Sequence, residues 1–153
     1  MMLRGYRAGD LELLSGTWLS GELLGLPLPN WPVLAEPATV GPPSDETSEL
    51  CVAPGTGFVR YCDVDWVHRR ARLEIGVRRE AADSAELLIS AAVAYGFRTL
   101  SLRRVYGWVT PATHPPPYLC ERAGLQREAT IPSAVWFDGR PVPREILAAV
   151  RRD

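Results

Sequence analysis

The chain has 153 residues with 17 basic and 18 acidic side chains, so its formal net charge is only −1. A nearly neutral chain has no overall field that attracts nucleic acid or an anionic membrane, so neither is expected as a partner and charge-driven recognition must be local. Every basic residue is an arginine, which excludes a lysine as catalytic base or Schiff-base nucleophile.

Length and apolar patterning indicate one domain. A chain of this size buries roughly 70% of its unfolded surface around a single core, so residues 1–153 are expected to fold together. The sequence has no apolar run near the roughly 20 residues that span a bilayer and opens without a signal-peptide core, which predicts a cytoplasmic protein. Its three cysteines lack C-x-x-C spacing, so reduced thiols are expected and a metal site is not.

The N-terminal part begins with residues 3–7, which alternate weakly and predict a short strand. Asp10 is expected to cap a helix that ends at Gly21. The apolar face of this helix consists of Leu11, Leu13, Leu14 and Trp18. Prolines recur from residue 26 to residue 43 among apolar side chains, which predicts a loop that packs against the protein.

The middle of the chain has strand patterns. Residues 48–53 and 58–67 predict a hairpin around the turn at residues 54–57. Residues 72–77 alternate, so their apolar side chains face one way and Glu74 faces the other.

The clearest helix follows. Asp83 and Glu86 have the spacing of a capping box, which predicts the helix start. Its apolar stripe consists of Leu87, Leu88, Ala91 and Tyr95. Shorter elements are expected after it: a strand at residues 104–109, a helix at 118–123 that Gly124 ends, an extended segment from Leu125, a hairpin at 136–140 and a final helix at 145–151.

Three segments in fixed order, at residues 71–77, 94–105 and 120–125, resemble the second half of a GNAT acetyltransferase domain of the RimJ/RimL-like kind. Residues 137–140 are similar to the last hairpin of that family. The resemblance covers roughly residues 57–142. It implies a GNAT-like α/β fold, a central mixed β-sheet flanked by helices on both faces, with a cleft where two neighbouring strands splay.

The sequence departs from the family in the loop after the strand that holds Glu74. There the family has a Q/R-x-x-G-x-G/A motif whose backbone amides hold the CoA pyrophosphate, and glycine lets the backbone approach. Residues 78–84 contain no glycine and place Glu80 and Asp83 near the phosphate position. Because these carboxylates would repel a phosphate, no cofactor is expected, and acetyl-CoA is expected only if the enzyme is a conventional acetyltransferase.

A second departure lies before the last short helix. The family's Asn, Ser and Tyr correspond here to Thr113, Pro116 and Cys120. The prolines at 115–117 also remove amide donors from the first turn of that helix. The usual cofactor contacts and the usual general acid are therefore both missing.

Three carboxylates are candidates for acid–base or binding roles. The resemblance implies that Glu74 is a general base toward an amine, and Asp65 is a second candidate base. Asp63 and Asp65 share a strand face by alternation, close enough to bind a cation or an ammonium group. The alternative for all three is the solvated polar face of a strand.

The other candidates are cationic or aromatic. His114 and Tyr118 flank the triple proline, where either side chain can donate a proton to a leaving group. Arg78 and Arg79 can clamp an anionic group through bidentate hydrogen bonds, and Trp108 can line a substrate pocket. The alternatives are a helix-capping histidine, a packed tyrosine, surface arginines and a core tryptophan.

These features predict an enzyme of specialised metabolism that acts on a small amine-bearing metabolite, free or bound to a carrier protein, by elimination or ring closure without acetyl-CoA. One alternative is a conventional N-acetyltransferase, because direct attack by an amine needs little more than a base and orientation. The other is a non-catalytic binding or dimerisation module, since fold does not guarantee activity. A homodimer is a further expectation.

Overall fold

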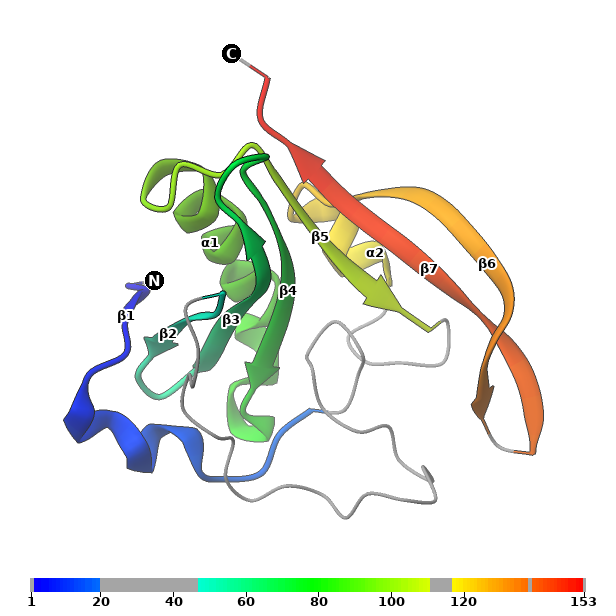
Figure 1. The fold of residues 1–153 in the computed structure, drawn as a ribbon. Helices are drawn as coiled ribbons and strands as arrows, with labels where there is room; N and C mark the ends of the chain where they lie inside the picture. Colours follow the sequence, from blue (N-terminus) through cyan, green and yellow to red (C-terminus); the bar gives the residue numbers. More distant parts are fainter. Residues whose placement is uncertain (1, 20–46, 111–116, 138, 153) are drawn as a thin grey trace.

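The computed structural model describes residues 2–19, 47–110, 117–137 and 139–152. They form one seven-stranded sheet in the order β1-β2-β3-β4-β5-β7-β6 (Figure 1). Its strands are β1 (Arg4–Gly5), β2 (Glu49–Ala53), β3 (Gly57–Asp65), β4 (Arg70–Val77), β5 (Arg104–Val109), β6 (Gln126–Phe137) and β7 (Arg140–Val150). All neighbours pair antiparallel except β4 and β5, which are parallel. The predicted mixed sheet is confirmed.

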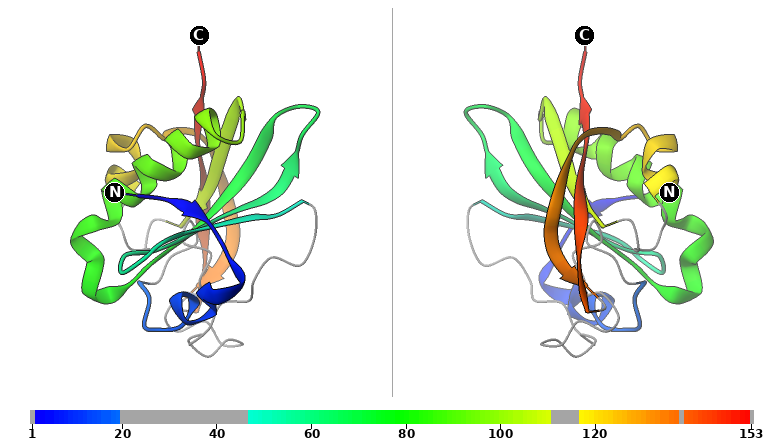
Figure 2. Two further views of the ribbon diagram at one scale, coloured as in Figure 1. Left: turned by 90° about the vertical axis from the view of Figure 1, so that its left-hand side faces the viewer. Right: turned by 90° about the vertical axis from the view of Figure 1, so that its right-hand side faces the viewer.

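Helices cover both faces of the sheet, as predicted. The helices α1 (Ala85–Arg98) and α2 (Pro117–Arg122) lie on one side of it (Figure 2). The 3-10 helix η1 (Ala8–Leu14) packs on the opposite face. None of the helices in the described ranges is long and apolar enough to cross a membrane.

The main core lies between the sheet and α1. Alternation in β3 and β4 turns Tyr61 and Leu73 toward this helix, and the two residues are paired across the strands. Both are fully buried, and a buried leucine side chain stabilises the fold by about 1.5–3 kcal/mol. The Tyr61 hydroxyl donates a hydrogen bond of 2.6 Å to the Ala92 carbonyl of α1, and its burial raises the pKa of the phenol.

A second, smaller core holds η1 against the other face of β2 and β3. It consists of Leu14, Trp18, Leu50, Val52 and Phe58. The Trp18 and Phe58 rings meet edge to face at 5.2 Å between centroids. Gly76 of β4 makes room for this packing, because a Cβ at that position would lie 2.1 Å from the Phe58 ring.

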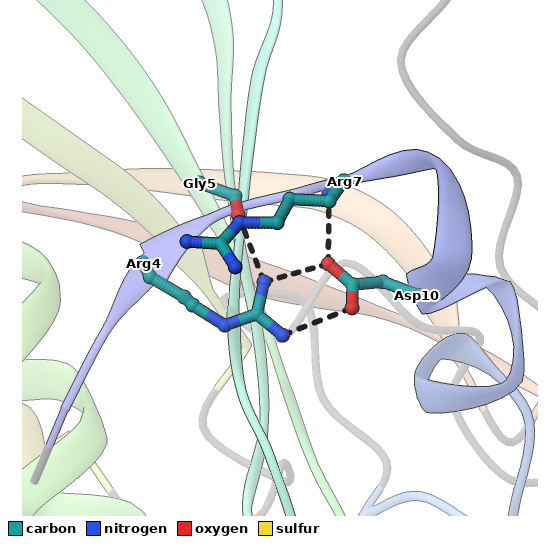
Figure 3. Close-up of polar contacts among 4 residues, drawn as sticks. All are labelled: Arg4, Gly5, Arg7 and Asp10. Carbon is teal, nitrogen blue, oxygen red and sulfur yellow. Dashed lines mark hydrogen bonds and ion pairs between the residues drawn. The ribbon is translucent and has the colours of Figure 1, made fainter.

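An ion pair fixes the start of η1 (Figure 3). The Arg4 guanidinium donates hydrogen bonds of 2.7 and 2.9 Å to the two Asp10 oxygens, and the Arg7 backbone N–H donates one of 2.7 Å. The predicted helix therefore differs in detail. Asp10 lies inside the first turn rather than at its cap, the helix is 3-10, and it ends at Leu14; Gly21 lies outside the described residues.

The ion pair between Arg4 and Asp10 is expected to make the stability of the fold decrease at acid pH. Hydrogen bonds from Arg4 lower the pKa of Asp10 to about 2, whereas an unfolded aspartate has a pKa of about 3.9. A depressed folded pKa gives stability that is complete above about pH 5 and is lost progressively as the pH falls through 2. We expect Asp10→Asn to lower the melting temperature at pH 7, and the gap to wild type to narrow progressively as the pH falls from about 5 through 2. Thermal unfolding followed by circular dichroism measures both curves, and a constant gap would contradict the assignment.

Two predicted features of the helices are wrong. Of the helix predicted at residues 145–151, residues 145–150 belong to strand β7, where Leu147 and Ala149 point into the main core and Ala149 pairs with Val105 of β5. A run buried on a central strand is continuously apolar, so its pattern does not separate strand from helix. The capping box is also absent, because a 3-10 turn, η2 (Arg79–Ser84), precedes α1, and Ser84 makes no side-chain cap hydrogen bond.

The C-terminal hairpin of β6 and β7 is the longest in the sheet and extends beyond α2 (Figure 1). Its outer strand β6 is irregular. The register with β7 shifts between Ile131 and Val135, where Pro132 occurs and Ser133 has a left-handed φ of 49°. Trp136, near the tip, is exposed.

Candidate functional site

The sheet opens between β4 and β5. These strands pair over three residues, Arg70, Ala71 and Arg72 with Arg104, Val105 and Tyr106, and then diverge (Figure 1). Within the described chain, the β5 side of β4 at residues 73–76 therefore has no strand partner. An unpaired strand edge offers backbone donors and acceptors to an extended ligand that contains amide groups.

A charged cluster lies on β3 and β4 beside this opening. The register places Arg60 opposite Glu74 and Cys62 opposite Arg72, on the face away from α1. Arg72 donates a hydrogen bond of 2.9 Å to Glu74 Oε1, and Arg60 Nη1 lies 3.7 Å from Oε2. All three charged side chains are between 19% and 26% exposed, so both oxygens of a half-buried carboxylate are engaged by guanidinium groups.

Cys62 belongs to the same cluster but is not suited to nucleophilic attack. Burial first, and then the charge of Glu74, raise the pKa of its thiol to about 12. A thiol with this pKa remains protonated at neutral pH, and the thiolate is the reactive form. The cluster is therefore a carboxylate–arginine site.

Two aromatic residues of β5 lie across the opening. Tyr106 pairs with Arg72, and Glu74 and Trp108 each lie two residues further along their strands, on the same sheet face. The Arg144 guanidinium of β7 covers the Trp108 ring at 4.5 Å from its centroid. The structure thus brings Glu74 and Trp108, both sequence candidates, to one face on the two sides of the opening.

Asp63 and Asp65 lie at an irregularity of β3. A bulge between Cys62 and Asp65 interrupts the alternation that predicted a common face, and Asp63 has a left-handed φ of 51°. Asp63 is 72% exposed and forms an ion pair of 3.6 Å with Arg72.

Asp65 stabilises the turn that follows β3. Its carboxylate accepts hydrogen bonds from the backbone of Val67 and from the backbone and ring of His68, at 2.9 to 3.1 Å. These bonds lower the pKa of Asp65. Asp65 pairs with Arg70, and Glu74 lies four residues further along β4, roughly 13 Å at about 3.3 Å per residue.

The loop after β4 uses its amides within the protein. The Arg78 N–H donates to the Thr56 carbonyl at 2.9 Å, and the Arg79 N–H donates to the Thr17 carbonyl at 3.0 Å. The amides of Ala81 and Ala85 donate inside the 3-10 turn. These four N–H groups do not form a cradle for a diphosphate, and Glu80 is exposed beside them.

Arg78 has a structural role. Its guanidinium donates a hydrogen bond of 2.9 Å to the Leu13 carbonyl, lies 4.9 Å from the centre of the Trp18 ring, and is 14% exposed. It therefore holds the N-terminal segment to the loop instead of pointing toward a ligand. Arg79 is exposed on η2.

The proton donors predicted near the triple proline have no described side-chain geometry. Tyr118 lies on α2, and His114 lies outside the described residues. The site residues that sequence reasoning missed are Arg60, Arg72 and Arg144. Arg72 could have been assigned to the site from the sequence, because it alternates with Glu74 on the same strand. The positions of Arg60 and Arg144 depend on the register between strands, which the sequence does not give.

No family model matches the chain, and no curated protein matches its sequence. Solved structures match its fold. A point mutant of the spermidine N-acetyltransferase SpeG from Vibrio cholerae has a TM-score of 0.71 at 20% identity, covering 97% of this chain and 92% of that chain. A second point mutant has a TM-score of 0.70 at 19% identity, covering 98% and 95%. A dodecameric structure of the enzyme has a TM-score of 0.62 at 22% identity, and the match spans 69% of this chain and 66% of that one.

These matches confirm the fold class predicted from the sequence. They also correct one prediction. The expectation that the chain needs no cofactor is wrong, because the solved proteins that share its fold over nearly the whole chain are acetyltransferases.

Proposed function

The chain has a GNAT fold, and we propose that it is an N-acetyltransferase for a small amine that also carries an anionic group. The observation that carries the proposal is the half-buried Glu74 carboxylate between Arg60 and Arg72, beside the opening of the sheet. A carboxylate here can take a proton from an incoming ammonium group, and the neighbouring guanidinium groups can bind a carboxylate or phosphate of the same substrate.

The charge of this face argues against a polyamine as the substrate. Five arginines of the described strands lie on it, namely Arg60, Arg70, Arg72, Arg104 and Arg144. The carboxylates beside them are Glu74 in the cluster and Asp63, Asp65 and Glu128, which pair with Arg72, Arg70 and Arg104. A ligand with several positive charges would meet guanidinium groups at short range, whereas a zwitterionic amine pairs its anionic end with them.

Each residue of the site then has a separate task. Acetyl-CoA, when bound, would supply an activated acyl thioester. Glu74 would accept the proton of the attacking amine, Arg72 would hold the Glu74 carboxylate in place, and Arg60 would pair with the anionic group of the substrate. Trp108, covered on one side by Arg144, would form an apolar wall across the opening.

The described residues suit one part of acetyl-CoA better than another. The unpaired edge of β4 suits the amide-bearing arm of the molecule. Four amides of the loop after β4, those of Arg78, Arg79, Ala81 and Ala85, do not suit the diphosphate, because they donate to Thr56, to Thr17 and within the turn.

A thiol-release assay with acetyl-CoA and a panel of amines tests the proposal. We expect kcat/KM for α- and ω-amino acids to exceed that for spermidine and for simple alkyl monoamines by at least about tenfold, the worth of one good charge pair. A preference for spermidine would overturn the substrate class. No thiol release with any amine, from protein shown to be folded, would instead favour a non-catalytic binding module, which the occupied loop amides also fit.

A further inference from the structure

Three Arg-Arg pairs meet at the paired end of β4 and β5. They are residues 69–70, 103–104 and 151–152, which are far apart in the sequence. Arg70 pairs with Arg104 across the parallel strands, and the Arg151 N–H donates a hydrogen bond of 2.9 Å to the Arg103 carbonyl. Figure 1 shows the turn after β3, the start of β5 and the end of β7 together at this end. A chain with a net charge of −1 thus gathers six arginines in one place.

A pocket of about 470 Å³ lies among these arginines. It is lined by Arg69, Ser101, Arg103 and Arg151. Guanidinium groups bind phosphate oxygens in pairs of parallel hydrogen bonds, so three of them around one pocket can hold more than one phosphate group.

Backbone contacts hold the pocket residues in fixed positions. The Arg69 carbonyl accepts hydrogen bonds from the N–H groups of Arg103 and Arg104 at 2.7 and 3.1 Å, and the Arg69 guanidinium donates one of 3.1 Å to the Ser101 carbonyl. Arg69 and Ser101 both have left-handed φ values, 56° and 58°. This conformation is uncommon for residues other than glycine and persists where the surroundings impose it, often at binding sites.

The C-terminus of α1 lies nearby, and its carbonyl groups would repel an anion if they faced the pocket. They are engaged elsewhere. The Tyr95 carbonyl accepts from the N–H groups of Thr99 and Leu100, and the Gly96 carbonyl accepts from Leu102. The Phe97 carbonyl accepts a hydrogen bond of 2.9 Å from Arg151 itself. The helix end therefore orients one pocket arginine, and the carbonyls of Tyr95, Gly96 and Phe97 are engaged.

We propose that this pocket binds a small oligophosphate, either inorganic or the terminal diphosphate of a metabolite. The site is separate from the candidate acyl-transfer site, because Arg70 and Glu74 are four residues apart on β4, roughly 13 Å at about 3.3 Å per residue. The pocket lies at the end where β4 and β5 are paired. A bound oligophosphate would therefore contact all three segments that carry the arginines and hold them together. The proposal does not depend on the acetyltransferase activity.

Isothermal titration with sodium pyrophosphate, tripolyphosphate, phosphate and sulfate at constant ionic strength tests the site on the full chain. We expect pyrophosphate or tripolyphosphate to bind with micromolar affinity, at least about tenfold tighter than sulfate, and to raise the melting temperature. Arg103→Gln should weaken this binding at least about tenfold. Arg140→Gln, an exposed arginine at the start of β7, is the control and should bind like wild type.

A second variant covers the case in which Arg103→Gln fails to fold. Arg69→Asn keeps a residue type that tolerates the left-handed conformation and removes one guanidinium, so it should fold and bind at least about fivefold more weakly. Equal binding of sulfate and pyrophosphate, or an equal loss in Arg140→Gln, would show a nonspecific charge effect and overturn the proposal. Tighter binding of an RNA oligonucleotide than of tripolyphosphate would overturn the ligand class.

Discussion

Replacing Glu74 with glutamine is expected to lower kcat/KM for acyl transfer by about two to four orders of magnitude, because a positioned general base contributes that factor. Glutamine keeps the shape of the side chain and can still accept a hydrogen bond from Arg72, but it cannot take a proton from the substrate amine. The loss should appear mainly in kcat, since the substrate's anionic group still meets Arg60. Steady-state kinetics with the best amino acid of the panel measures it.

The matched control for this variant is Glu128→Gln. Glu128 is also a strand carboxylate that pairs with an arginine, Arg104, but it lies on the C-terminal hairpin and outside the cluster around Glu74. We expect its kcat/KM to stay within about threefold of wild type. If Glu74→Gln were as active as this control while both variants were folded by circular dichroism, Glu74 would not be the base.

Replacing Gly57 with alanine is expected to destabilise the fold by about 3 kcal/mol, at the upper end of the cost of overpacking. A Cβ at this position would lie 1.9 Å from the Gly76 carbonyl oxygen of the neighbouring strand and 3.1 Å from Leu88 Cδ2 of α1. Backbone cannot move aside as a side chain can, so β3 and β4 must separate locally. For a domain of this size, such a loss lowers the melting temperature by roughly 6–12 °C.

Gly5→Ala provides the comparison for the Gly57 variant. A Cβ on Gly5 would have no atom within 4 Å, so we expect a change of less than about 0.5 kcal/mol. Urea unfolding of both variants, analysed with a common slope, gives the two free energies of unfolding. A Gly57 variant as stable as the Gly5 variant would mean that the sheet relaxes more easily than the close approach implies.

Local pattern was sufficient to predict most of the sheet. The alternation around Leu73 and Ile75 predicted both the strand β4 and the outward direction of Glu74, because a strand side chain has only two directions. The same reasoning failed for β7. Its segment from Glu145 to Val150 is rich in residues that favour helices, and only its neighbours β5 and β6 make it a strand.

The environment of the site was less predictable, because it depends on contacts between distant segments. Arg78 was expected to bind an anion, but its hydrogen-bond partner, the Leu13 carbonyl, lies 65 residues away in the chain. The carbonyls of Thr17 and Thr56 that occupy the loop amides come from two other segments. The sequence did not show which carbonyl groups would accept hydrogen bonds from the amides of Arg78 and Arg79.

The irregular outer strand β6 has a consequence for how molecules of this chain meet. The two edges of the described sheet are β1, which is two residues long, and β6, which is broken by the shift between Ile131 and Val135 and by Pro132. An added strand needs a long, flat row of free backbone groups, and a proline or a bulge removes that template. Neither edge therefore favours pairing with an edge strand of a second molecule. This is expected to protect the protein against fibrillar aggregation at high concentration.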